Sequence, residues 1–269
     1  KLRASYGTAG LRPQYDAQYE ILQISAGSPQ KITLGNPDLK PAFSTEKELG
    51  FNLNFLSRFT LEYSYSDKVT KDQILQVPLS AAAGYRTQWQ NAGTLAGNTH
   101  ELAASVLLLS QADYFWRVNV TGDRTRTRIT ALAVPPFLNG PDGNTQLFRV
   151  APGEVFGVMY GERWIKTADQ LATTIAAKKL AGVASDYVVN EEGYYVNAAA
   201  KGTPAERPLK AFLASGSSLQ TIGDVNPDFN ASLNNTMQWK GLSVNTLFNW
   251  VKGGNIYNLT RQWPFNEER

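Results

Sequence analysis

Apolar and polar residues alternate with a period of two in three separate parts of the chain, and this pattern limits the fold more than any other feature. Every second residue is apolar in 49–55 and, after a short turn, again in 59–65. Residues 102–120 and 233–250 repeat the pattern on both sides of a short connection. A strand places successive side chains on opposite faces, whereas a helix repeats every 3.6 residues. The alternation therefore predicts antiparallel β-hairpins with arms of about ten residues.

Two all-β folds present such two-faced strands, and they make different demands on the polar face. A soluble sandwich turns its polar face to water and should carry many charges there. A transmembrane barrel turns its apolar face to lipid, gathers aromatic residues at both membrane boundaries and lines a wet interior with its polar face. Here the polar faces favour Asn, Ser, Thr and Gly over Lys and Glu, and aromatic residues stand near strand ends and turns. With 11% aromatic and only 18% charged residues, the pattern favours the barrel and leaves the sandwich as the alternative.

The connections between these strands differ in length on the two sides. Three are tight turns, whereas residues 67–84, 130–144 and above all 161–223 form long connections that are expected to be loops. Outer-membrane barrels have short periplasmic turns and longer extracellular loops. Residues 161–223 are accordingly predicted to be a long extracellular loop, either a functional lid or partly disordered, with one short helix within 168–180.

Several classes of chemistry are excluded by composition. The chain has no Cys and a single His, so cysteine nucleophiles, disulfides and His-rich metal sites are ruled out, and a Ser-His-Asp triad would depend on His100 alone. A net charge of +3 is too small to indicate nucleic-acid binding. We therefore predict no enzyme activity, no catalytic residue, no metal and no cofactor.

Three motifs, in order along the chain, carry a resemblance to a known family. The first is Gly35-Asn36-Pro37-Asp38-Leu39-Lys40-Pro41, followed by Glu46 and Glu48-Leu49-Gly50. The second is Pro152-Gly153 with Phe156-Gly157-Val158-Met159-Tyr160-Gly161. The third runs from Gly223-Asp224-Val225-Asn226-Pro227-Asp228-Phe229 to Gly253-Gly254-Asn255-Ile256-Tyr257-Asn258. Together they resemble the barrel signatures of TonB-dependent outer-membrane receptors, and the later two resemble the SusC/RagA-like branch.

The resemblance implies an antiparallel transmembrane β-barrel of about 22 strands around an N-terminal plug, in the bacterial outer membrane. Such receptors import an oligosaccharide, peptide or similar solute with energy passed on by TonB, and this branch commonly works with a SusD-like surface lipoprotein. Residues 1–269 would then be a partial β-barrel domain without the plug. The alternatives are a secreted all-β carbohydrate-binding module, a passive porin or a structural component of the envelope.

The candidate binding residues lie on strand ends and in the long loop. Arg124, Arg126 and Arg128 project from one face where a strand leaves the membrane, and are expected to contact lipid phosphates or, as the alternative, an anionic solute. Trp164, Tyr194 and Tyr195, together with Tyr187, would form a sugar-stacking platform or pack the loop against itself.

Other polar residues have simpler predicted roles. His100 is expected on the apolar face as a structural or interfacial residue, while Glu62, Arg117 and Asp123 are expected on the interior face. A calcium site at Glu191-Glu192 or in residues 140–144 is weighed against a plain turn, which is favoured because the EF-hand spacing is absent.

Overall fold

The computed structural model describes residues 1–140 and 146–260, which form two compact units. Residues 158–223 make one unit, and the described residues on either side of them make the other. The flanking unit contains the strands β1 (Leu2–Leu11), β2 (Ile21–Ser25), β3 (Ser28–Leu34), β4 (Ala42–Phe55), β5 (Phe59–Pro78), β6 (Thr87–Gln111), β7 (Tyr114–Leu132), β8 (Phe137–Asn139), β9 (Phe148–Val150), β14 (Pro227–Trp239) and β15 (Leu242–Gly253). None of the helices within the described residues is long and apolar enough to cross a membrane.

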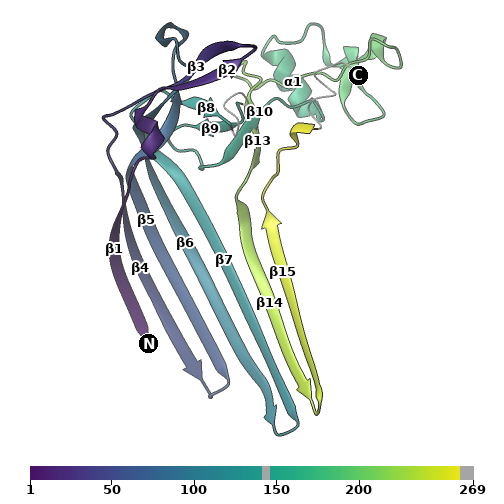
Figure 1. Ribbon diagram of the computed structural model, residues 1–269. Coiled ribbons are helices and arrows are strands. Elements are labelled where there is room, and N and C mark those ends of the chain that lie inside the picture. Colours follow the sequence, from purple (N-terminus) through teal and green to yellow (C-terminus); the bar gives the residue numbers. More distant parts are fainter. Residues whose placement is uncertain (141–145, 261–269) are drawn as a thin grey trace. The chain divides into compact units, whose positions relative to one another are not determined.

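Seven of these strands form one antiparallel sheet in the order β1-β4-β5-β6-β7-β14-β15. The long strands β4 to β7 run side by side, and the β14–β15 hairpin continues the sheet beside β7 (Figure 1). A short β2–β3 hairpin joins the far end of β6 through parallel pairing of Thr33 with Thr87. The predicted antiparallel β fold is confirmed.

Cross-strand pairing sorts the side chains of this sheet into an apolar and a polar face. One row across the strands consists of Leu53, Leu61, Ala104, Val120, Leu233 and Phe248. The adjacent row, on the opposite face, contains Asn54, Thr60, Ser105, Asn119 and Asn234. The apolar face is open: Leu53 is 52% exposed and Phe248 is 63% exposed. A soluble sandwich would bury these side chains in a core, so the exposure favours contact with lipid.

Short turns join the strands at one end of the sheet. Strands β4 and β5 meet at Phe55 and Phe59, with Leu56 and Ser57 in the left-handed region at φ 51° and 53°. The β14–β15 turn at Lys240-Gly241 likewise places Lys240 at φ 51°. Positive φ values give such tight turns, of three residues between β4 and β5 and of two between β14 and β15, the twist that antiparallel strands require. The three predicted hairpins are confirmed, but the predicted arm length of about ten residues is too short, because β5, β6 and β7 have 20, 25 and 19 residues.

The prediction of a loop over residues 67–84 is wrong, because β5 continues to Pro78. Its ladder with β6 runs past a bulge between Thr70 and Gln73, where Asp72 has a φ of 55°, and ends at Pro78 opposite Thr87. The connection shrinks to residues 79–86, which include the 3₁₀ helix η2 (Ala81–Ala83). Ladder hydrogen bonds use only the backbone, so a strand can extend through polar residues after its apolar alternation has ended. Residues 130–144 are also partly strand, since β7 reaches Leu132 and β8 follows; residues 141–144 lie outside the described residues.

A small core lies where β8 and β9 pair beside the main sheet. It consists of the buried residues Leu75, Val77, Ala92, Ile129 and Val150, against which Leu95, Leu132, Val134 and Phe137 pack. Burial of these apolar side chains stabilises the end of the strands opposite the short turns. Elsewhere in the sheet the apolar face is exposed.

The unit at 158–223 has a core of its own. It comprises β10 (Val158–Gly161), α1 (Ala168–Ala176), the paired strands β11 (Tyr187–Val189) and β12 (Tyr195–Asn197), and β13 (Gln220–Asp224) with β10. Helix α1 starts at a capping box in which Thr167 and Gln170 bind each other's backbone amides. The expected helix is therefore present, and its buried Leu171 packs with Ile165, Tyr187 and Ala211.

Candidate functional site on the polar face and outer end of the sheet

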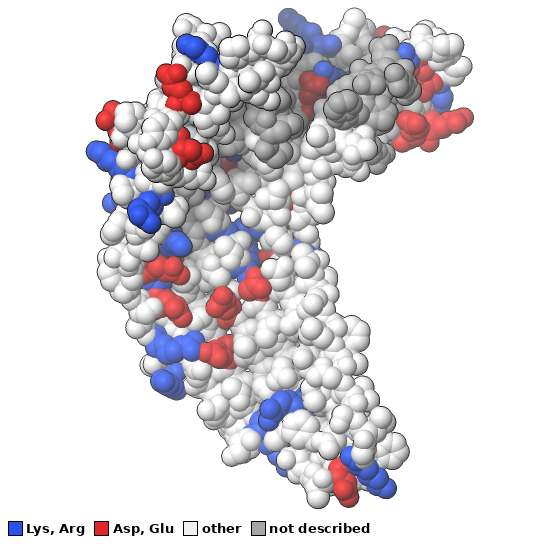
Figure 2. All heavy atoms as spheres, in the orientation of Figure 1, with Lys and Arg blue, Asp and Glu red and all other residues white. Residues whose placement is uncertain are grey.

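Charged side chains gather on the polar face, near the middle of the strands. Register places Arg3, Gly50, Ser64, Glu101 and Asp123 in one cross-strand row. Figure 2 shows acidic and basic side chains next to one another in a band across the sheet. The predicted interior positions of Glu62, Arg117 and Asp123 agree with this register.

Hydrogen bonds organise this band. Arg3 forms an ion pair with Glu62 and also donates to Ser64 Oγ at 3.2 Å. Ser64 Oγ in turn donates to Glu48 Oε1 at 2.7 Å. Gly50 makes room for this network, because a Cβ there would lie 2.8 Å from the Tyr63 carbonyl oxygen and 3.1 Å from Arg3 Nη2. A shallow depression of about 360 Å³ is lined by Arg3, Glu62, Ser64, Glu101, Thr121 and Asp123, among others.

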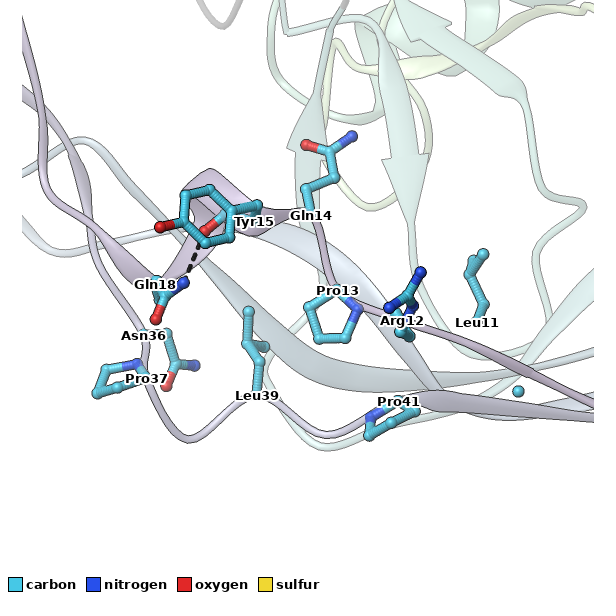
Figure 3. A pocket seen from close by; sticks show the side chains of 11 residues that line it. Leu11, Arg12, Pro13, Gln14, Tyr15, Gln18, Asn36, Pro37, Leu39 and Pro41 are labelled. Carbon is cyan, nitrogen blue, oxygen red and sulfur yellow. Dashed lines mark hydrogen bonds between the residues drawn. The ribbon is translucent and has the colours of Figure 1, made fainter.

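A second hollow lies at the outer end of β1, away from the short turns (Figure 3). The β1–β4 ladder ends at Leu11 and Ala42, and the two backbones meet again where the Asn36 amide donates to the Ala17 carbonyl at 2.9 Å. Between these points the chains separate around a space of about 850 Å³ lined by Gly10, Leu11, Arg12, Pro13, Gln14, Tyr15, Gln18, Asn36, Pro37, Leu39 and Pro41. Proline has no amide hydrogen, so the three prolines help to keep the ladder open.

The hollow carries an exposed aromatic residue beside planar polar groups. Tyr15 is 79% exposed and meets Tyr19 edge to face, with 3.2 Å between the two hydroxyl oxygens. That hydrogen bond raises the pKa of Tyr19 above its ordinary value. Arg12 and Gln14 stand on the same stretch (Figure 3). Sequence reasoning missed this hollow, although the Pro and Tyr residues between Leu11 and Tyr19 are a signal that could have marked it.

The first signature motif braces this region. A Cβ on Gly35 would lie 2.4 Å from the Gln18 carbonyl oxygen, so only glycine lets the two segments cross. Asn36 Nδ2 donates to the Trp89 carbonyl at 2.8 Å. Asn91 Oδ1 accepts a hydrogen bond from the Lys40 amide at 2.8 Å, and Asn91 Nδ2 donates one to the Lys40 carbonyl. The motif thus ties the segment before β4 to β6.

The second and third motifs meet in the same way. Asn226 Nδ2 donates to the Phe156 carbonyl at 2.9 Å, and the Val225 amide donates to the Gly157 carbonyl at 3.2 Å. Gly157 has a φ of 103°, and a Cβ on it would lie 2.5 Å from Val225. These motif residues have a structural role in the contacts that the structure describes.

The three predicted arginines project from the apolar face but have different partners. Register pairs Arg124 with His100, Arg126 with Asn98 and Arg128 with Ala96. Arg126 donates to the Pro227 carbonyl at 2.7 Å and to Asp228 Oδ1 at 2.9 Å, while Arg128 donates to the Gly153 carbonyl at 3.0 Å. Two of the three therefore hold neighbouring segments of this unit together.

The predicted aromatic platform is divided by the fold of the 158–223 unit. Tyr187 is buried in the core, and Tyr195 packs against it. Trp164 stays partly exposed beside Lys210, with which it forms a backbone bridge. Tyr194 lies under Lys166, whose Nζ is 4.9 Å from the ring centre. Tyr187 and Tyr195 thus pack the segment against itself, and Trp164 and Tyr194 remain available at its surface.

Acidic side chains in this unit are held by specific donors. The Lys210 ammonium, 2.7 Å from Glu162, lowers the pKa of that carboxyl, and Ser218 adds a hydrogen bond. The Gly202 amide and Asn190 lower the pKa of Glu206 in the same way. Glu191 and Glu192, the calcium candidates, lie in a turn where Asn190 Oδ1 accepts the Glu192 amide at 3.1 Å. The other candidate segment falls largely outside the described residues.

Comparison with known proteins gives one family. The family model described as "TonB dependent receptor-like, beta-barrel" matches residues 1–259. TonB-dependent receptor P3 of Formosa agariphila is 25% identical over 97% of this chain, and TonB-dependent receptor P26 of the same organism is 23% identical over 96%. This chain spans 26% of the length of either relative.

A solved structure supports the same fold. A structure of the RagAB peptide importer in the "closed-closed" state matches 94% of this chain, with a TM-score of 0.64 and 19% sequence identity. This chain spans 26% of the matched chain. The likeness shows that the curved two-faced sheet is the fold of a segment of a barrel wall.

Proposed function

The chain belongs to the TonB-dependent receptor family, as part of its β-barrel, and on this premise we propose that the protein imports an oligosaccharide, peptide or similar solute with energy from TonB. Receptors of this family are outer-membrane proteins, and this sheet lies in that membrane. They act as receptors and transporters rather than as enzymes. No bond-making chemistry is needed for this role.

The two-faced sheet is the observation that carries the proposal. Its apolar side chains are exposed, as lipid contact requires, and its opposite face carries amides, hydroxyls and the Arg3–Glu62–Ser64–Glu48 network. Such a wall separates hydrocarbon from a wet interior. A polar solute can exchange its water for these groups at little cost, because hydrogen bonds to water and to the wall are nearly equivalent.

Residues 161–223 are proposed to form an extracellular loop region of the receptor. They connect strands at the end opposite the short turns, and barrels of this kind place their long connections outside the cell. The exposed Trp164 and the half-buried Tyr194 would offer ring surfaces to a solute there. The RagAB neighbour is named a peptide importer. A SusD-like surface lipoprotein is proposed as a partner because the later two motifs of this chain resemble the SusC/RagA-like branch.

Uptake by cells that carry the full-length protein tests the proposal. Labelled oligosaccharides and peptides of graded size are supplied to the wild type, to a strain without the gene and to one without TonB. Loss of uptake of one solute class in both mutant strains would support TonB-driven import. Uptake that persists without TonB but disappears without the gene would instead show a passive porin.

Substitution of two tyrosines tests whether the hollow at the outer end of β1 takes part in solute binding. Tyr15→Ala removes a ring that is 79% exposed in the hollow, and Tyr6→Ala removes one that is 68% exposed on β1, outside the hollow lining. If the hollow binds solute, Tyr15→Ala raises the half-saturating solute concentration and Tyr6→Ala leaves it unchanged. Equal effects would remove the hollow from the solute path.

A further inference from the structure

Cationic and aromatic side chains gather on the outward face of the sheet, where its apolar band ends. One cross-strand row contains Leu49, Tyr65, His100 and Arg124. Phe229 pairs with Lys252 on the neighbouring hairpin, and the Lys252 Nζ lies 5.9 Å from the Phe229 ring centre. The feature belongs to the barrel wall and does not depend on which solute the protein carries.

The strand length sets this row at the membrane boundary. Ten residues separate Phe229 from Trp239 near the short turn. At about 3.4 Å per residue and a tilt of about 45°, they span roughly 24 Å in height, which matches an apolar band of about 25 Å. Because short turns are periplasmic, Trp239 marks the inner boundary, and Phe229 with its row marks the outer one.

The side chains of this row present several hydrogen-bond donors together. The Tyr65 and His100 rings lie 5.0 Å apart, and Tyr63 Oη lies 2.8 Å from His100 Nδ1. When the Tyr63 hydroxyl donates to Nδ1, the imidazole proton sits on Nε2 and is free to donate to another group. Arg124, the cross-strand neighbour of His100, is exposed and brings a planar fork of N–H groups.

Cations outnumber carboxylates in this outward zone. Lys47, Arg124, Arg128 and Lys252 are exposed on the outward side, where Asp67 is the cross-strand neighbour of Lys47. The carboxylates of Glu46, Glu48, Glu62, Glu101 and Asp123 belong instead to the polar face. The outward zone therefore attracts anions at the height of the lipid headgroups.

We propose that Arg124, with His100 and Tyr65 beside it, binds a phosphate group of an outer-leaflet lipid. A guanidinium and a phosphate form paired charge-assisted hydrogen bonds, and the acyl chains of the same lipid would lie against Leu102 and Val120, which are closer to the short turns. Lys252 adds a second cation at the same height. A free phosphate would lack the apolar contacts, so the site selects a lipid.

Binding of lipid A to the full-length receptor in phosphatidylcholine nanodiscs tests this site. Diphosphoryl lipid A is compared with the dephosphorylated molecule, which has the same acyl chains. Arg124→Gln is expected to weaken diphosphoryl lipid A binding about five-fold, since a basic residue near a lipid surface contributes about 1 kcal/mol and 1.4 kcal/mol is a factor of ten. Arg117→Gln, on the polar face of the same strand, is the matched control and should leave binding unchanged.

A chemical footprint on the wild type keeps the test independent of folding of the variants. Phenylglyoxal modifies accessible arginines, so phosphorylated lipid A should slow modification of Arg124 several-fold and leave Arg117 unaffected. The proposal is overturned if Arg124→Gln and Arg117→Gln bind lipid A equally well. It is also overturned if dephosphorylated lipid A protects Arg124 as strongly as the phosphorylated form.

Discussion

A charge placed on the apolar face should destabilise the protein according to its depth in the membrane, and Leu233→Arg is the sharpest case. Leu233 lies on β14, four residues from Phe229 at the outer boundary and six from Trp239 at the inner one. With a rise of about 2.4 Å in height per tilted residue, it sits roughly 10 Å and 14 Å from the two boundaries. It is therefore close to the midplane.

The expected cost follows from that position. An arginine on the lipid face of a barrel costs about 2–4 kcal/mol at the midplane and about 0–1 kcal/mol near either boundary. Leu233→Arg should thus lower the folding equilibrium constant about 30- to 700-fold at 1.4 kcal/mol per factor of ten. Met237→Arg, two residues from Trp239, should cost about 1 kcal/mol or less. Asn234→Arg faces the wet interior and should cost only about 1 kcal/mol, for the hydrogen bond from Thr236 that it loses.

Equilibrium folding of the full-length protein into lipid vesicles, followed by urea titration, measures these differences. The depth ranking Leu233→Arg, then Met237→Arg, is the decisive readout, because a soluble core would penalise both charges heavily. Similar losses for Leu233→Arg and Asn234→Arg would refute the assignment of the two faces.

Three further changes test other parts of the fold. Gly35→Ala should lower the melting temperature, because its methyl group would clash with the Gln18 carbonyl at a cost of about 1–3 kcal/mol. Gly7→Ala is the control, since the space around Gly7 is open. Equal melting temperatures of the two variants would contradict the close approach at Gly35. Ile165→Ala, at a fully buried position, should lower the stability of the 158–223 unit by about 2–5 kcal/mol and so speed its proteolysis. Val183→Ala, at an exposed position, is the control. Unchanged cleavage of Ile165→Ala would argue against a separate core in this unit. The Gly202 amide and Asn190 lower the pKa of Glu206, so the stability that these hydrogen bonds contribute is present above the ordinary pKa of about 4.3 and is lost as pH falls through the lowered pKa of the folded protein. In that pH range, hydrogen exchange at the Gly202 amide should quicken in the wild type and show no such step in Glu206→Gln. Identical exchange profiles would refute the hydrogen bond from Gly202 to Glu206.

The strand regions could be predicted because alternation reports directly on the two environments of a barrel wall. A one-residue slip between residues 49–55 and 59–65 would move every apolar side chain of one arm to the other face, so the alternation restricts the register. The far ends of the strands were harder. Residues 67–78 carry no regular alternation, and only the backbone ladder with β6 shows that they are strand.

The candidate site was predicted in part for a similar reason. Successive residues of a strand take opposite faces, and this alternation predicts the faces of His100, Glu62 and Asp123. The register between strands agrees with each of these predictions. Alternation could not show that Arg126 would meet Asp228, or that Arg3 would reach Glu62, because these partners come from distant segments.

By itself, the sequence determined the strands, the lipid-facing side and the family signatures, because each depends on residues close together in the chain. Only the tertiary structure decided what the signatures do. Gly35 is required where the backbone near Gln18 crosses it, and Asn226 joins residues from two motifs about seventy positions apart. The same holds for the outward row of Tyr65, His100 and Arg124, since three strands must align before their side chains can act together. Local pattern sets which face a side chain takes, and the register between strands sets which side chains meet on it.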